Sequence, residues 1–195
     1  MRKYDPIPNT PNPKKHPMDS IDTIETERLT AERFRLEHYD LLCRMHRDPA
    51  VMATLGGVRA DEMTRQFLEE NVTHWESHGF GLWILRDRTS GDFAGRGGLK
   101  YIDVGGHLEI ELGYSFLADY WGRGLATEIA ETSLVVGFDR LGLGNLVCFT
   151  LTTNFASQRV MQKVGFTFER EVVHKGRVTL LSRMTRDEYR LRRSG

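Results

Sequence analysis

The stretch from Trp121 to Glu128 has the residue types and the spacing of an anion-binding turn. Gly122 and Gly124 flank Arg123, and the residues that follow have the apolar pattern of a helix. Glycines let backbone N–H groups approach a ligand closely, and the unpaired N–H groups and dipole of a helix N-terminus favour negative charge. Arg123 adds a cation at the rim. A glycine-rich turn between a strand and a helix therefore predicts a phosphate site.

The same turn argues against a dinucleotide site. A dinucleotide-binding loop needs a third glycine, but Thr127 stands in its place. It also needs an acidic residue about 20 positions further on, after the next strand. Asp139 falls at the end of the predicted helix instead. The strand before the turn belongs to an antiparallel meander, so a dinucleotide-binding oxidoreductase is only a remote alternative.

The segment 107–117 alternates apolar and polar residues, as a half-buried strand does. Its apolar face carries Leu108, Ile110, Leu112, Tyr114 and Phe116, and its polar face carries His107, Glu109, Glu111, Gly113 and Ser115. Glu109 and Glu111 thus share one face. Like charges about 7 Å apart could raise the pKa of one of the two carboxyl groups.

Two longer stretches resemble a known family. ELGYSFLADYWGRGLATEIAE (111–131) and TTNFASQRVMQKVGF (152–166) resemble the GNAT superfamily of acyl-CoA N-acyltransferases. Within it, the closer resemblance is to the branch of ribosomal-protein N-acetyltransferases (RimJ/RimL-like), which IETERL (24–29) also resembles. This implies an N-acetyltransferase that moves an acetyl group from acetyl-CoA directly to a primary amine, either a protein N-terminus or a small molecule. A non-catalytic acyl-CoA-binding module of the same fold is the alternative.

The resemblance also implies which residues bind the cofactor. The family's pyrophosphate loop has the form Q/R-x-x-G-x-G/A, which places Trp121 first, Gly124 fourth and Ala126 sixth. Trp121 departs from Q/R, but backbone amides carry the phosphate contact. The pantetheine arm is expected along 114–117, at the backbone of Phe116. The full set of implied cofactor-binding residues is Phe116, Trp121, Gly122, Arg123, Gly124, Leu125, Ala126, Thr127, Asn154 and Lys163.

Acetyl transfer needs a neutral amine, and a general base adds roughly 10²–10⁴-fold to the rate. Glu111 is the preferred base because it lies on the polar strand face, just before the expected cofactor arm. Glu109, on the same face, and His107, at the turn, are the alternatives. The two acidic side chains favour a cationic acceptor.

Transfer also releases a thiolate, which an acid could protonate. Many family members place a tyrosine about four residues before the glycine that ends the last helix, but Met161 stands there. Ser157 is the expected donor instead, and Tyr114 is a further candidate. Asn154 and Ser157 also have the spacing of a helix cap, which is the purely structural interpretation.

No metal site is predicted. His74 and His78 lie four residues apart on a predicted helix, but the zinc-protease pattern needs Glu directly after the first histidine, and Trp75 stands there. A solvated helix face explains the pair better.

These residues need a scaffold of strands and helices. Periodicity predicts strands at 26–35, 80–86, 93–102, 107–117, 145–153, 166–174 and 177–185, and helices at 37–48, 60–78, 125–140 and 154–164. An antiparallel meander followed by a β-α-β crossover predicts an α+β fold. We expect the GNAT fold, with a mixed sheet of six or seven strands and helices on both faces.

Composition sets the remaining expectations. In 195 residues, 27 Lys and Arg balance 27 Asp and Glu, which disfavours binding to nucleic acid or to an anionic membrane. Two cysteines, Cys43 and Cys148, form no disulfide framework, and the absence of a long apolar run predicts no membrane span, so we expect a cytoplasmic protein. Residues 1–22 hold five of the six prolines and read as a flexible tail before a single domain at 23–190. The chain could form a homodimer.

Overall fold

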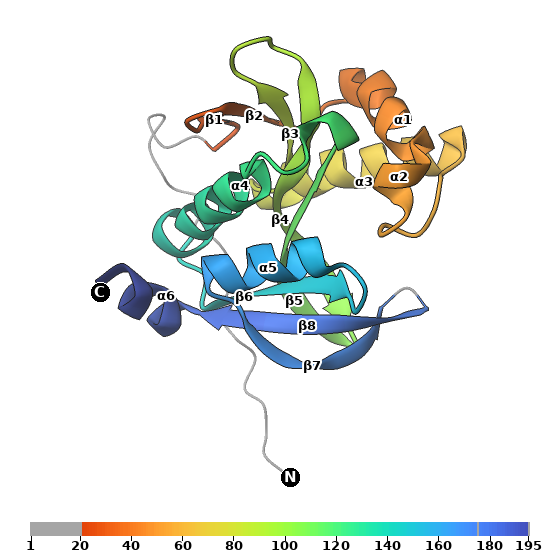
Figure 1. The fold of residues 1–195 in the computed structure, drawn as a ribbon. Coiled ribbons are helices and arrows are strands. Elements are labelled where there is room, and N and C mark those ends of the chain that lie inside the picture. The colour runs from red at the N-terminus through yellow and green to blue at the C-terminus, as the bar shows by residue number, and fades with distance from the viewer. Residues whose placement is uncertain (1–20, 175, 195) are drawn as a thin grey trace.

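The computed structural model describes residues 21–174 and 176–194. Within them the chain forms one sheet with helices packed against it (Figure 1). The tail predicted over residues 1–22 lies outside the described residues, except for its last two. Ile21 is buried, and its carbonyl accepts a hydrogen bond from the Trp83 indole N–H at 2.8 Å. Asp22 pairs with Arg33. The folded part of the chain therefore begins no later than residue 21.

The sheet is mixed, and its described part has eight strands in the order β1-β2-β3-β4-β5-β6-β8-β7. All neighbouring strands are antiparallel except β5 and β6, which are parallel. The strands are β1 (Thr23–Glu25), β2 (Leu29–Arg33), β3 (Leu82–Asp87), β4 (Phe93–Val104), β5 (His107–Phe116), β6 (Asn145–Leu151), β7 (Thr167–His174) and β8 (Arg177–Thr185). The predicted sheet of six or seven strands is thus too small, and the seven predicted strand segments are one too few. The strand missed is β1, which is too short for alternation to reveal.

The helices include all four that were predicted. They are η2 (Leu36–His38), α1 (Tyr39–Arg47), α2 (Pro49–Met52), α3 (Asp61–His78), η3 (Ala118–Tyr120), α4 (Leu125–Leu134), η4 (Val135–Arg140), α5 (Phe155–Val164) and α6 (Arg186–Ser194). The helix predicted at 125–140 is α4 continued by η4, a π-helical segment. No helix in the described ranges is both long and apolar enough to cross a membrane.

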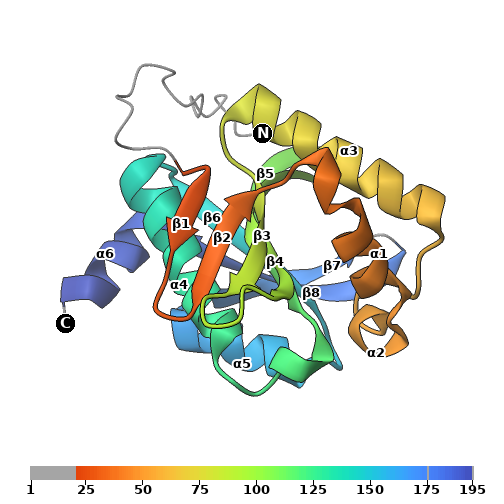
Figure 2. The same ribbon diagram turned by 90° about the horizontal axis from the view of Figure 1, so that it is seen from above.

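The helices cover both faces of the sheet, as predicted. Figure 2 shows α1, α2 and α3 on one side of β2, β3 and β4, and α4 and α5 on the other side. Trp75 of α3 lies against Trp83 of β3, with ring centroids 6.1 Å apart. On the opposite face, a Cβ added to Gly97 of β4 would lie 3.3 Å from Ile129 of α4. The strands in the middle are therefore buried on both sides, as their low exposure confirms.

Local sequence signals set the ends of the main helices. Gly79 ends α3 with φ +70°, and its N–H bonds to the Trp75 carbonyl. Asn154 caps α5 by accepting a hydrogen bond from the Ser157 N–H. The glycines of β4 allow close strand packing, because a Cβ at Gly95 would come within 2.3 Å of the Ser115 carbonyl oxygen.

Candidate active site

The two halves of the sheet separate between β5 and β6. The parallel ladder there contains a single bridged pair, Glu111 with Val147, within the described part of the chain. In Figure 1, β6, β7 and β8 run across the lower part of the molecule, while β3 and β4 stand above them. β5 therefore has a free edge beyond Glu111 toward its C-terminal end.

The free edge presents backbone polar groups. In an antiparallel pair, opposed residues alternate between exchanging hydrogen bonds and pointing away from the partner strand. The Leu117 N–H donates to the Ala94 carbonyl at 2.9 Å, which fixes this alternation for β5 and β4. By that register, the backbone N–H and C=O groups of Tyr114 and Phe116 point away from β4, into the space where β6 has diverged. An extended ligand could hydrogen-bond there.

A glycine turn leads from this edge to the N-terminus of α4. Gly122 and Gly124 have φ values of +74° and +77°, and no side chain of the described residues caps the helix. The N–H groups of Thr127 and Glu128 both bond to the Gly124 carbonyl at 3.1 Å. The first two N–H groups of the helix have no intrahelical acceptor. They belong to Leu125 and Ala126. A Cβ at Gly122 would meet nothing within 4 Å, so the turn is open to a phosphate.

Arg28, in the turn between β1 and β2, adds a cation beside this loop. Its Nη1 donates to the Arg123 carbonyl at 2.6 Å, and a Cβ at Gly124 would lie 3.6 Å from its Nη2. Its Nε and Nη2 also bind Glu128 of α4 at 2.7 Å each. Burial alone would raise the pKa of Glu128, but hydrogen bonds from Thr26 and Arg28 lower it, so the carboxylate stays ionised. Arg28 lies within the stretch IETERL (24–29), which resembles the family, but residue types alone did not assign it a role.

Trp121 and Phe116 lie together at the entrance to the loop. The Trp121 indole N–H donates to the Phe116 carbonyl at 2.9 Å, so the first residue of the predicted loop is tied to the end of β5. By the register of β5 and β4, the Phe116 N–H still points toward the free edge, as do the backbone groups of Tyr114. The Arg123 guanidinium lies 5.2 Å from the Tyr120 ring centroid. The cofactor residues predicted in 116–127 are therefore continuous in space.

The two predicted carboxylates have different surroundings. Glu109 forms a bidentate ion pair with Arg183 of β8, at 2.7 and 3.0 Å. Glu111 is half-buried, and a Cβ at Gly113 would lie 3.8 Å from its Cδ and Oε1. The carboxyl group therefore lies over Gly113, toward the free edge. His107 is exposed at the opposite end of β5. Of the three candidate bases, the structure brings only Glu111 to the free edge.

The side chains around Glu111 are cationic rather than acidic. Lys100 of β4 is directly opposite Glu111 in register, so their side chains are neighbours. Glu111 also acts electrostatically on Arg96, on the same strand as Lys100. Glu109, paired with Arg183, is engaged elsewhere. Cations therefore lie near Glu111 as well, and the cationic acceptor expected from the two acidic side chains stays a prediction.

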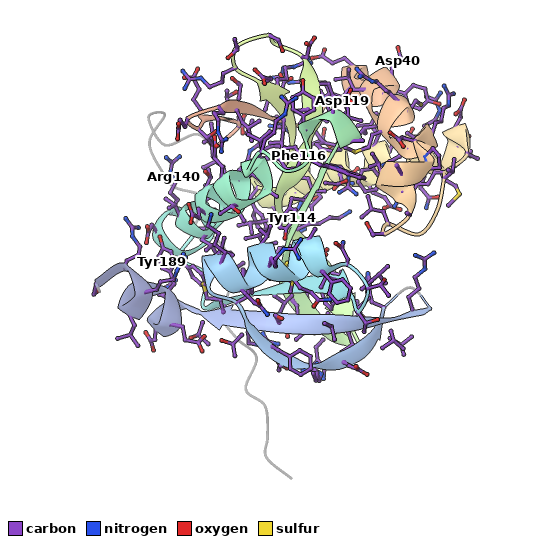
Figure 3. All side chains as sticks on the ribbon, viewed as in Figure 1. Asp40, Tyr114, Phe116, Asp119, Arg140 and Tyr189 are labelled. Carbon is purple, nitrogen blue, oxygen red and sulfur yellow. The ribbon has the colours of Figure 1, made fainter. Side chains whose placement is uncertain are left out.

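Ser157 and Tyr114 meet across the separated strands. Their hydroxyl oxygens are 3.0 Å apart, and either can donate. Burial raises the pKa of Tyr114, with a smaller contribution from Cys148, so this hydroxyl stays protonated at neutral pH. Met161, which replaces the tyrosine of many family members, is buried, and its sulfur lies 3.9 Å from the Ser157 Oγ. In Figure 3, Tyr114 lies just above α5, and Phe116 lies further along β5.

The other two residues predicted on α5 lie at its opposite ends. Asn154 is at the N-terminus, where its side chain caps the helix. Lys163 is exposed in the last turn, nine residues and about 13 Å away along the axis. The structure brings Asn154 close to Ser157, but it does not bring Lys163 to the same place.

The histidine pair on α3 has a structural role. Nδ1 of His74 lies 2.9 Å from the Phe80 carbonyl, and the Tyr101 N–H donates to Nε2 at 3.0 Å. Both ring nitrogens are thus engaged with the backbone, and the His78 ring packs on His74 and Tyr101. A hollow of about 520 Å³ lies beside this helix, apart from the glycine loop. Its lining residues are Gln66, Glu69, Glu70, Thr73, His74 and Lys100.

Comparison with protein families gives one match that spans most of the chain. The model described as the acetyltransferase (GNAT) domain matches residues 28–167. Among curated proteins, YkkB of Bacillus subtilis strain 168 is 28% identical over 151 residues, covering 74% of this chain and 88% of YkkB.

Solved structures share the fold. An acetyltransferase from Agrobacterium tumefaciens strain C58 superposes with a TM-score of 0.75 at 23% identity, covering 88% of this chain and 98% of that one. RimL, a ribosomal L7/L12 alpha-N-protein acetyltransferase solved in complex with coenzyme A, gives a TM-score of 0.67 at 18% identity, covering 84% and 97%. At these identities the similarity establishes the fold alone.

Proposed function

Because this chain belongs to the GNAT acetyltransferase family, whose members use acetyl-CoA, we propose that it transfers an acetyl group directly from acetyl-CoA to a primary amine. The amine belongs to a protein N-terminus or to a small molecule. The antiparallel pairing of β4 with β5, the strand before the glycine loop, disfavours the dinucleotide alternative. The single observation that carries the proposal is the placement of the open glycine loop and the free edge of β5 next to Glu111.

The loop supports a role in binding the pyrophosphate of acetyl-CoA. Gly122 and Gly124 leave space at the N-terminus of α4, and its first N–H groups and dipole favour anions. Arg28 and Arg123 lie beside the same loop and add positive charge. The carboxylate of Glu128 in the first turn is neutralised by Arg28, so it does not repel a phosphate strongly.

The free edge of β5 supports a role in holding the pantetheine arm and the acetyl carbonyl. The N–H groups of Tyr114 and Phe116 face the space beyond the last β5–β6 pair, by the register of β5 and β4. A backbone N–H held in a fixed direction can stabilise the oxyanion that forms when an amine attacks a thioester carbonyl. Holding both substrates side by side supplies a further part of the rate, about 7–11 kcal/mol at best.

Glu111 is the proposed general base. Its carboxyl group lies over Gly113, near the N–H groups that would hold the thioester. In the reaction the amine nitrogen forms a bond to the acetyl carbon, the carbon–sulfur bond breaks, and Glu111 accepts the proton lost by nitrogen. The leaving thiolate receives a proton from the hydroxyl pair of Ser157 and Tyr114, whose oxygens lie 3.0 Å apart. The pair then regains a proton from solvent, and Glu111 releases the proton taken from the amine to solvent, which restores the enzyme. In this proposal the hydroxyl pair takes the role of the tyrosine that many family members have at the position of Met161.

The test is calorimetric titration with acetyl-CoA of the wild type and of Gly124→Glu. We expect wild-type binding, and about a hundredfold or greater loss in the variant, because the new carboxylate occupies the loop and several charged hydrogen bonds are lost. Gly106→Glu is the matched control, since Gly106 also has positive φ but lies in the β4–β5 turn. A wild type that does not bind acetyl-CoA would contradict the proposed function. Equal binding by wild type and Gly124→Glu would contradict the assignment of the loop.

A further inference from the structure

Three cationic side chains gather around one aromatic ring close to Glu111. The guanidinium carbons of Arg96 and Arg59 lie 4.8 and 5.0 Å from the ring centroid of Phe67, and the Lys100 Nζ lies 5.8 Å from it. Arg96 and Lys100 come from β4, Phe67 from α3, and Arg59 from the loop before α3. We call these four residues the Phe67 cluster. Such a concentration of positive charge requires an explanation.

Arg96 is the most unusual member of the Phe67 cluster. It is 8% exposed, and its Nε is buried with no hydrogen-bond partner among the residues that the structure describes. Burial and the neighbouring Arg59 lower the pKa of Arg96 to about 10, although Glu111 acts in the opposite direction. A buried guanidinium is stable when hydrogen-bonded to an anion and costly when it is not. Neither Arg96 nor Arg59 forms an ion pair with a described residue. No carboxylate of the described chain therefore binds these two arginines.

His46 of α1 contributes a second buried polar atom at the same ring. Its ring centroid lies 5.1 Å from that of Phe67, and it is fully buried. Nδ1 lies 3.0 Å from the Thr64 Oγ1, while Nε2 has no partner within the described residues. Burial, then Arg96 and Arg59, lower the pKa of His46 to about 3, so the ring is neutral. It therefore offers hydrogen bonding without adding charge.

The carboxylates within reach do not neutralise the two arginines by contact. Glu111 acts on Arg96 and Glu70 acts on Arg59, in both cases electrostatically rather than by an ion pair. The backbone of Arg59 is held by α1, because its N–H donates to the His46 carbonyl at 3.0 Å. The guanidinium groups of Arg59 and Arg96 both lie at the Phe67 ring, and each is a planar set of hydrogen-bond donors. That geometry matches a carboxylate, which guanidinium binds with two parallel hydrogen bonds.

We propose that Arg96 and Arg59 bind a carboxylate of the acceptor, so that the substrate is a small amine that also carries a carboxylate, of the amino-acid class. This rests on the proposed function, because it places the acceptor amine at Glu111. Lys100 is directly opposite Glu111 in the strand register, and it shares the Phe67 ring with Arg96. The base and the arginines therefore lie close enough to be spanned by one small molecule. A diamine would instead be repelled by the cluster.

The first test compares acceptors that differ only in the carboxylate. The twenty free L-amino acids, their amides and spermidine are supplied with saturating acetyl-CoA, and release of the CoA thiol is followed. At least one amino acid should have a kcat/KM about ten to a hundred times that of its amide, as expected for a charged hydrogen-bonded contact. Amides or spermidine that react as well as the acids would overturn the proposal. So would a complete lack of turnover with all amino acids in a protein that still binds acetyl-CoA.

The second test assigns the preference to the two arginines. In Arg59→Gln and Arg96→Gln, the KM of the preferred acid should rise about ten- to a hundredfold, with little change in kcat and little change for its amide. Arg59→Gln is the safer variant if the buried Arg96→Gln does not fold. Arg190→Gln, on the exposed face of α6, is the control for the same loss of charge. Equal losses for the acid and the amide would count against a carboxylate subsite.

A third set of measurements distinguishes a wrong acceptor class from failure of the proposed function itself. Calorimetry with acetyl-CoA is repeated on each arginine variant, and binding should be unchanged. If the wild type binds no acetyl-CoA, the proposed function itself fails. If tetrapeptides are acetylated at their N-terminus and free amino acids are not, the function stands but the small-molecule acceptor class is wrong. If only tetrapeptides with an acidic side chain are acetylated, the proposed small-molecule acceptor is wrong, and the carboxylate that the arginines bind belongs to a peptide.

Discussion

Glu109 and Glu111 are two residues apart on one face of β5, yet their environments assign them different roles. Glu109 is 17% exposed and is bound by both terminal nitrogens of Arg183, which also pairs with Glu169 of β7 at 2.5 Å. These contacts connect β5 with β8 and β7. Glu111 instead lies over Gly113 at the end of the last β5–β6 pair. One carboxylate joins parts of the sheet, and the other faces the place where the strands have separated.

This difference predicts different effects for the two amide substitutions. Glu111→Gln should lower kcat by about 10²–10⁴-fold, since a general base is removed, while acetyl-CoA binding is retained. Glu109→Gln should change kcat only a few-fold. It should lower the free energy of unfolding by about 1–3 kcal/mol, because charge-assisted hydrogen bonds to a partly buried arginine are lost. Steady-state kinetics and urea unfolding of both variants measure these quantities.

Each variant is the control for the other, because both remove one carboxylate from the same face. The base assignment would fail if Glu111→Gln kept more than about a tenth of wild-type kcat at saturating acceptor. A large fall in kcat for Glu109→Gln with normal unfolding would exchange the two roles.

The sequence could predict that the two glutamates share a face, but it could not distinguish them. Alternation along 107–117 depends only on local backbone geometry. The partner of Glu109 is Arg183, 74 positions further along the chain. Likewise the cations near Glu111 come from β4 and from the loop before α3. Local periodicity carries no information on such distant pairs, so the sequence could not show that cationic side chains lie near Glu111.

At the scale of elements, the turn between β1 and β2 is fastened to the start of α4. Arg28 and Thr26 of the turn both bind Glu128, and Arg28 also holds the Arg123 carbonyl of the glycine loop. The turn therefore fixes the direction of the helix N-terminus and at the same time places a guanidinium beside it. An anion at the loop would experience both effects.

Arg28→Met should weaken acetyl-CoA binding by about three- to tenfold, since a partly exposed cation and a positioning contact are both lost. Arg88→Met is the matched control. Arg88 binds the Thr26 carbonyl of the same turn and is similarly exposed (42% against 46%), but it pairs with Glu25 rather than with α4. Calorimetry should find the control within about twofold of wild type. Equal weakening by both substitutions would mean that Arg28 acts only by holding the turn.

The elements that the sequence missed are those held by tertiary contacts. In α6, the apolar Tyr189 stacks on Phe138 with centroids 4.8 Å apart, and Arg192 and Arg193 bind groups on other elements. Its sequence, RDEYRLRRS, is dominated by charged residues and has only Tyr189 and Leu191 as large apolar side chains, so the sequence did not predict a helix there. The helices with clear periodicity, such as α3 and α5, were predicted to within a residue or two. A helix that buries a broad apolar face can be predicted from its sequence, as α3 and α5 were, whereas α6 is held by a few tertiary contacts and could not be.

At the scale of the whole molecule, the defining feature is a sheet that is continuous at Glu111 and separated beyond it. The strand order follows from local rules: short turns join antiparallel neighbours, and the crossover through α4 makes β5 and β6 parallel. The extent of the separation does not follow from such rules. It depends on how the helices pack on the two faces, with Tyr114 reaching Ser157 of α5 across the gap. The sequence could therefore predict the fold class and the loop, whereas the arrangement of the acceptor side emerges only in three dimensions.

Two buried neutral histidines join α1 to α3 and α3 to the sheet. His46 packs on Phe67 and reaches Thr64, and His74 bridges the backbone of Phe80 and Tyr101. Burial lowers the pKa of His46 to about 3 and that of His74 to about 4, from 6.5. For His46, Arg96 and Arg59 add to this effect. For His74, His78 adds to it and the Phe80 hydrogen bond opposes it.

Because both pKa values are lower in the folded state than in the unfolded state, the unfolded chain binds more protons below pH 6.5. The free energy of unfolding should therefore be constant with respect to these groups above about pH 7 and fall as the pH decreases from 6.5 toward 4. The slope approaches about 1.4 kcal/mol per pH unit for each histidine. Urea unfolding of wild type and His74→Gln at pH 7.5 and 5.0 measures it. Glutamine can keep both backbone hydrogen bonds, so the variant should fold and lose about 1–2 kcal/mol less than wild type over this interval. An equal loss in both proteins would show that His74 is protonated in the folded state.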